Sequence, residues 1–167
     1  LNFMHVFLDF ETRSRADLPA VGAYRYAQDP STDIFMAAVS GMDPADPVYL
    51  WINPKFADAG VTSDPEAIAM LRGATEVHAH NAPFELAVLE GAGNGLLPSI
   101  TLDKWRCTQA MARLAALPES LEKCGAAINI GNAKDKAGKD LIVFFSMPQA
   151  DGTFNEPHAH PAKWAQF

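Results

Sequence analysis

The stretch MHVFLDFET, residues 4–12, decides the fold, because it is a short apolar run that ends in two acidic residues. Such a run predicts a buried β-strand. Asp9 and Glu11 stand two positions apart, and alternate side chains of a strand share a face, so both carboxylates are expected on one side of a sheet. Two ionised carboxylates held together without a cation are costly. The pattern therefore favours a divalent metal ion, and the alternative is a frayed strand end with two solvated acids.

The rest of the chain predicts an α/β fold in which helices pack on the faces of a sheet. Strands are predicted where apolar runs lie between turn residues, at positions 4–10, 34–39, 48–52, 76–81 and near 105. Helices are predicted at positions 65–73, 83–89, from 108 onward with the spacing of 117–128, and around 141–145. The residues Ser63-Asp64-Pro65-Glu66 read as a capping box with Ser63 as the N-cap. Residues 17–30 have no clear pattern. Strands that come first and then alternate with helices are typical of this class.

The second acidic element is HNAPFE, residues 80–85, at a predicted junction between a strand and a helix. Asn81 suits an N-cap and Pro83 suits the first turn. Glu85 then lies in the first helical turn, where the free N–H groups and the helix dipole favour an anion. Taken alone, this element is also explained by helix capping.

Together the two elements resemble the first and second motifs of the DEDD (DnaQ-like) 3′–5′ exonuclease superfamily, whose members have the ribonuclease H-like fold. DFET ends the first strand, and HNAPFE follows about 70 residues later. Residues 17–34, 106–124 and 134–142 are similar to the proofreading exonuclease domain of phage-type family A DNA polymerases. The resemblance implies a mixed sheet with helices on both faces. It also implies that residues 1–167 belong to one exonuclease domain.

The resemblance implies a catalytic site made of Asp9, Glu11 and Glu85. In the superfamily the equivalents of these residues hold two Mg²⁺ or Mn²⁺ ions, one of which activates water while the other stabilises the leaving 3′-oxygen. Asp9 is expected to contact both ions, Glu11 the ion that activates water, and Glu85 the second ion. The reaction would release a nucleoside 5′-monophosphate.

Three further positions are implied to bind the substrate, which is the single-stranded 3′ end of DNA. Thr12 is expected to contact the terminal nucleotide through its backbone, and Phe84 is expected to lie against the base. Asn81 belongs to the same element. The partner implied within the parent protein is a linked polymerase domain.

The sequence departs from the superfamily pattern in two ways. Glu85 stands where the usual residue is Asp, and its extra methylene moves the carboxylate by about 1 Å or more. The third motif, a Tyr or His four residues before an Asp, is absent, because no Asp follows Asp151 and neither His158 nor His160 has an acid four residues on. We therefore expect the last catalytic Asp beyond Phe167, and little activity from the 167 residues alone.

Length, charge and cysteine content restrict which partners and which cellular compartment the sequence predicts. A chain of 167 residues fits a single domain, and its formal charge of −7 argues against broad electrostatic binding of duplex DNA. The two cysteines, Cys107 and Cys124, predict reduced thiols, and no apolar run approaches the ~18 residues of a membrane span. The sequence thus predicts a cytoplasmic protein without a membrane partner.

Three alternatives follow from the same residues. His78 and His80 alternate on a predicted strand and could bind zinc with Asp9, although carboxylate-rich sites suit Mg²⁺ and a histidine beside Asn81 is more typical of loop orientation. An exoribonuclease of the same superfamily is a second reading, since no motif reads a 2′-hydroxyl. A binding module without turnover is the third.

Overall fold

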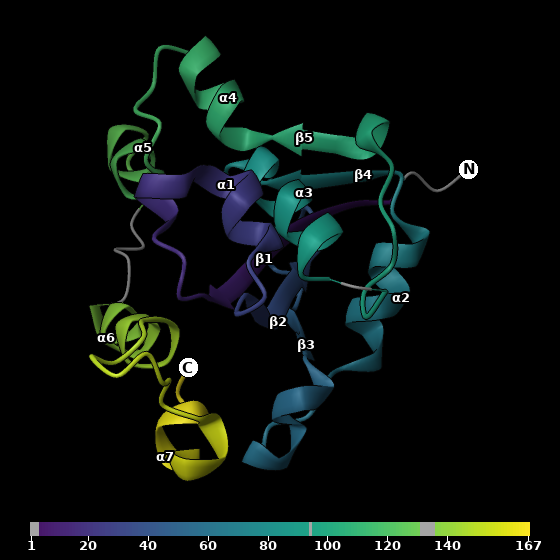
Figure 1. The fold of residues 1–167 in the computed structure, drawn as a ribbon. Coiled ribbons are helices and arrows are strands. Elements are labelled where there is room, and N and C mark those ends of the chain that lie inside the picture. The colour runs from purple at the N-terminus through teal and green to yellow at the C-terminus, as the bar shows by residue number, and fades with distance from the viewer. Residues whose placement is uncertain (1–3, 94, 131–135) are drawn as a thin grey trace.

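The computed structural model describes residues 4–93, 95–130 and 136–167 and contains a five-stranded mixed sheet. The strand order is β3-β2-β1-β4-β5 (Figure 1). β1 pairs antiparallel with β2 and parallel with β4, while β2–β3 is antiparallel and β4–β5 is parallel. The strands are β1 (His5–Arg13), β2 (Asp33–Ser40), β3 (Tyr49–Ile52), β4 (Glu76–Ala79) and β5 (Trp105–Cys107). The α/β fold is confirmed, and the mixed sheet is consistent with the ribonuclease H-like arrangement.

Helices lie around this sheet (Figure 1). The α-helices are α1 (Leu18–Gln28), α2 (Pro65–Gly73), α3 (Ala82–Gly91), α4 (Thr108–Leu114), α5 (Leu121–Ala127), α6 (Lys136–Ser146) and α7 (Pro161–Trp164). Short 3-10 helices are η1 (Pro54–Ala59), η2 (Leu102–Lys104) and η3 (Pro157–Ala159). α1 and α3 pack against each other over the sheet, and α6 and α7 lie together near the C-terminus (Figure 1).

The main hydrophobic core lies on the face of β1 that carries its even-numbered residues. Val6, Leu8 and Phe10 are almost fully buried there. They belong to one cluster with buried residues of α2 and α3, which include Leu71 and Val88. The alternation of β1 therefore decides which face becomes core, because its odd-numbered residues must point to the other side.

A second cluster joins the C-terminal helices to the sheet. Met36 and Ile52 are paired in register, and they pack with Phe145 of α6 and Trp164 of α7. Glu11 is paired with Met36, so this cluster lies on the face of the sheet that carries the odd-numbered residues of β1. Helices therefore pack on both faces.

Arg13 connects the end of β1 to the C-terminal region. Its side chain is 3% exposed and donates hydrogen bonds to Asp33 and Glu156, each at 3.0 Å. The guanidinium also lies over the rings of Phe35, Phe56 and Phe154, at 5.3, 4.9 and 4.6 Å from their centroids. Because two carboxylates compensate its charge, Arg13 can be buried.

Several local predictions are corrected by the structure. Ser63 does not cap α2, because its hydroxyl bonds to the backbone of Ile52, and Asp64 holds the N-cap position without a capping bond. Residues 18–28, which have no clear pattern, form α1 with a break at Gly22, whose φ of 76° is left-handed. The helix predicted from 108 to 128 is two helices. Ala116, with φ of 57°, lies in the turn between them.

Three further predictions concern the stretch 134–142, the two cysteines and membrane-spanning helices. Of the stretch 134–142, positions 134 and 135 are not described. Cys107 and Cys124 are free thiols and half-buried. Within the part of the chain that the structure describes, no helix combines the length and apolar character needed to cross a lipid bilayer.

Candidate carboxylate site

The first two acidic residues lie where β1 continues past its parallel neighbour. β1 pairs with β4 only at His5 to Phe7, whereas its pairing with β2 continues past Asp9 and Glu11. The far end of β1 therefore lies at the carboxyl ends of the two parallel strands, which is the usual place for ligands in open α/β sheets. Asp9 is exposed there and Glu11 is half-buried. A bulge after Glu11 changes the register and turns the next side chain.

The third acidic residue lies in the first turn of α3. Asn81 has a left-handed backbone, with φ of 85° and ψ of 48°, a conformation that Asn adopts more readily than most residues. Its carbonyl accepts a hydrogen bond from the N–H of Phe84 at 2.8 Å, which closes the first turn. Glu85 follows and is 3% exposed. Asn81 makes no side-chain capping bond, and its side chain is exposed.

The electrostatics of Glu85 depend on both other acidic residues. Burial is the largest cause and the negative charges of Asp9 and Glu11 add to it, and together they raise the pKa of Glu85 to about 9. A hydrogen bond from the backbone N–H of Phe10 acts in the opposite direction. Oε2 of Glu85 is buried and accepts no hydrogen bond. A buried acceptor without a donor, beside two other carboxylates, fits a bound cation.

The predicted substrate positions lie around the same turn. The hydroxyl of Thr12 is 3.0 Å from that of Tyr26, whose ring lies 5.9 Å from that of Phe84. Tyr26 is buried, so it packs in the core instead of being available to stack on a base. It connects β1, α1 and α3 and fixes the side chain of Thr12. The sequence carries no signal for this contact, because α1 has no clear pattern.

His78 and His80 do not form a zinc site with Asp9 in the described residues. The ring nitrogens of His80 lie 3.0 Å from the Thr108 hydroxyl and 2.7 Å from the Glu119 carbonyl. Both positions are therefore occupied, and His80 orients the loop that precedes α3. His78 stacks against His5 instead.

Replacing Glu85 with Gln is expected to change how stability depends on pH. The carboxyl group titrates near its ordinary pKa of 4.5 when unfolded and near 9 when folded, so between these values only the folded state holds the proton. Stability in metal-free buffer must then fall by about 1.4 kcal/mol per pH unit across this window. Glu85→Gln removes this loss. Urea unfolding at pH 5 and pH 7 should show the mutant gaining about 3 kcal/mol on the wild type.

Glu90→Gln is the matched control, because Glu90 lies on the same helix and is exposed. It should leave the pH dependence unchanged. Parallel stability curves for the wild type and Glu85→Gln would show that the Glu85 carboxyl group is not held protonated in the folded protein.

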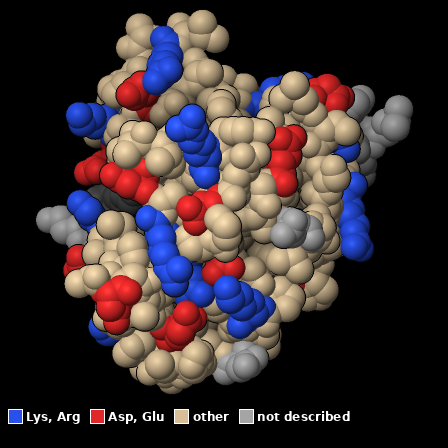
Figure 2. Space-filling view, in the orientation of Figure 1, with Lys and Arg blue, Asp and Glu red and all other residues tan. Residues whose placement is uncertain are grey.

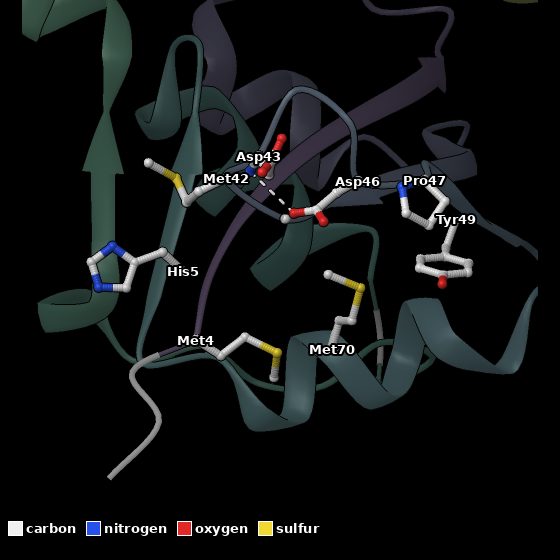
Figure 3. Close-up of a pocket in the computed structure, with 9 residues that line it drawn as sticks. Met4, His5, Met42, Asp43, Asp46, Pro47, Tyr49 and Met70 are labelled. Carbon is white, nitrogen blue, oxygen red and sulfur yellow. Dashed lines mark hydrogen bonds between the residues drawn. The ribbon is translucent and has the colours of Figure 1, made fainter.

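A hollow near the other end of β1 is lined mainly by apolar side chains. Met4, Met42, Met70 and Tyr49 lie around it, and an Asp43–Asp46 hydrogen bond closes one side (Figure 3). Its volume is about 620 Å³. Its described lining includes the acidic residues Asp43 and Asp46 but none of Asp9, Glu11 and Glu85.

The surface shows no dominant basic face in the view of Figure 2. Lys and Arg are interspersed with Asp and Glu over the face seen there. A formal charge of −7 agrees with this mixture. Any nucleic acid would have to be bound locally, because a broad phosphate-binding surface needs clustered Lys and Arg.

Comparison with known proteins finds a similarity to a DNA polymerase of a bacteriophage. The sequence matches no family model. It is 35% identical over 170 residues to a DNA polymerase of Bacillus phage SP02, a match that covers 96% of this chain. The chain spans about a quarter of the length of this curated relative, since the match covers 24% of the polymerase. The chain is thus related to one region of a phage DNA polymerase.

Proposed function

We propose that this chain is the metal-binding part of a 3′–5′ exonuclease domain that edits DNA ends for a phage-type DNA polymerase. The observations that support it most are the effect of the Asp9 and Glu11 charges on Glu85 and the buried Oε2 atom of Glu85, which accepts no hydrogen bond. The similarity to a phage DNA polymerase over 96% of the chain supports the same class. The resemblance of both acidic elements to exonuclease motifs adds the reaction type.

Each of the acidic residues and its neighbour Phe10 has a separate proposed role. Asp9, Glu11 and Glu85 would hold two Mg²⁺ or Mn²⁺ ions, which when bound supply an activated water and stabilise the leaving 3′-oxygen. Phe10 contributes its N–H to Glu85 and keeps that carboxyl group pointing inward. The raised pKa of Glu85 means that it must release a proton when a cation binds, because the ligand form is the carboxylate.

The residues beside the three carboxyl groups would receive the 3′ end of a single strand. Phe84 is half-buried against Tyr26, so one part of its ring is fixed while the rest is accessible to a terminal base. Aromatic stacking of this kind is worth about 1–3 kcal/mol per base and tolerates any sequence. Thr12, held by Tyr26, and the exposed Asn81 border the same turn.

Mg²⁺ is expected to raise the melting temperature of the wild type more than that of Asp9→Asn. A ligand that binds only the folded state stabilises it in proportion to the logarithm of its concentration over its Kd. Removing one carboxylate weakens the cation site, so the Mg²⁺-dependent shift should shrink. The measurement is a thermal melt of both proteins with and without Mg²⁺, and Glu66→Gln, an exposed acid on α2, is the control. Equal shifts in all three proteins would contradict the proposed metal site.

Activity is best tested in a longer protein that contains this domain, using labelled DNA and RNA strands. Trimming of DNA from the 3′ end in Mg²⁺ supports the proposal. Preference for RNA would assign the domain to an exoribonuclease, and no hydrolysis of either strand would leave only a binding module.

A further inference from the structure

Three metal-ligating side chains lie together near the opposite end of β1 from the carboxylates. They are His5 on β1 and Glu76 and His78 on β4, and one ligand atom of each lies within 4.8 Å of the others. His5 is paired with Glu76 and Phe7 with His78, so these side chains project from the same face of the sheet. The parallel register of two strands thus joins residues more than 70 positions apart.

The spacing of these atoms suits a tetrahedral ion. Oε2 of Glu76 lies 3.5 Å from Nδ1 of His5 and 3.4 Å from Nε2 of His78. With bonds of about 2.0–2.1 Å, neighbouring ligands of tetrahedral zinc are about 3.3–3.4 Å apart. The carboxylate oxygen therefore already stands at the required distance from both imidazoles. His5 is about one-third exposed and can adjust.

A second observation concerns the hydrogen bonding of the His78 ring. Its Nε2 atom is buried and has no hydrogen-bond partner, since the 3.4 Å contact with Glu76 lacks hydrogen-bond geometry. The ring is held between Phe7 and His5, at centroid distances of 5.4 and 5.6 Å. Leaving a buried nitrogen unsatisfied costs about 1–3 kcal/mol. A metal ion placed between the three ligand atoms would remove that cost.

Glu76 is also oriented from outside the cluster. Arg106 donates to Oε1 of Glu76 at 2.6 Å and to the carbonyls of Asp103 and Trp105 at 2.7 and 2.9 Å. One carboxylate oxygen is therefore held by Arg106 while the other faces the imidazoles. Outer hydrogen bonds of this kind orient the ligands in metal sites. The charge of Arg106 opposes a dication, but its side chain is 36% exposed and therefore well screened.

We propose that His5, Glu76 and His78 bind a transition-metal ion of the Zn²⁺ type, separately from the carboxylate site. Two imidazoles and one carboxylate suit Zn²⁺ and related ions, whereas Mg²⁺ prefers oxygen ligands alone. The fourth position faces outward, since His5 borders the hollow of Figure 3 with its ring pointing away from Met70 and Tyr49. The ion would link the start of β1 to β4 and so stabilise the parallel pair.

The test is a calorimetric titration of the chain with Zn²⁺. Because Zn²⁺ also binds carboxylates, all proteins carry Asp9→Asn, which makes the outcome independent of the proposed exonuclease site. One equivalent should bind and raise the melting temperature. Adding His5→Asn or Glu76→Gln should weaken binding at least about tenfold, as loss of metal-site partners does. His5 is the safer position, because it is less buried than His78.

His158→Asn is the matched control, because His158 is an exposed histidine of η3 and should leave binding unchanged. Co²⁺ gives a second readout, since a tetrahedral site containing imidazole produces a visible absorption band. Undiminished Zn²⁺ binding in both His5→Asn and Glu76→Gln would overturn the proposal, and so would the absence of binding in the Asp9→Asn protein.

Discussion

Asp9→Asn is expected to lower the rate of 3′-end hydrolysis at least about a thousandfold in a longer protein that contains this domain. Asp9 is the most exposed of the three carboxylates and is the residue proposed to contact both ions. Asn keeps the shape but removes the charge. Ion-centred stabilisation of the transition state is worth several kcal/mol, and about 4 kcal/mol corresponds to a thousandfold.

Two further variants make this result specific. Glu85→Asp restores the commoner superfamily residue and should keep much of the activity, because the charge stays and only the reach shortens. Glu66→Gln should behave as the wild type. The measurement is single-turnover trimming of a labelled DNA strand at saturating Mg²⁺. Full activity of Asp9→Asn would rule out the proposed role of Asp9 and the two-ion mechanism with it.

Arg13→Leu is expected to destabilise the chain by about 1.5–3 kcal/mol, the range for the loss of a hydrogen bond to a charged group. Arg13 is 3% exposed, and its removal leaves Asp33 and Glu156 without their shared cation. Three aromatic rings also lose their contact with the guanidinium. Lys55 still pairs with Asp33, so the uncompensated charge should fall mainly on Glu156.

The measurement for Arg13 is chemical unfolding at neutral pH, with Arg15→Leu beside it. Arg15 follows two positions later but is exposed, so its loss should cost no more than about 1 kcal/mol. Arg13→Lys should fall between the two, because Lys keeps the charge but not the fork that reaches two carboxylates. If Arg13→Leu and Arg15→Leu cost the same, the buried ion pairs do not anchor the C-terminal helices.

The sequence predicted the elements of the fold wherever a local pattern was strong. The apolar run before Asp9 gave β1, and Pro83 in the first turn with glycine at the end gave α3, observed at Ala82–Gly91. Period-2 alternation placed Asp9 and Glu11 on one face, because strand geometry alone requires it. The capping prediction at Ser63 was wrong because its hydroxyl bonds to the backbone of Ile52, and residues 17–30 had no pattern from which α1 could be predicted.

The tertiary structure decided the properties that depend on distant pairings. Three properties follow from contacts between elements far apart in the sequence. β1 extends beyond its pairing with β4, Glu85 is buried with a pKa near 9, and the hydroxyl of Tyr26 contacts that of Thr12. The cluster of His5, Glu76 and His78 exists only through the parallel register of β1 and β4. Local sequence fixes period, capping and charge. It does not fix which strands meet or how deeply a carboxyl group is buried, since those depend on packing of the whole chain.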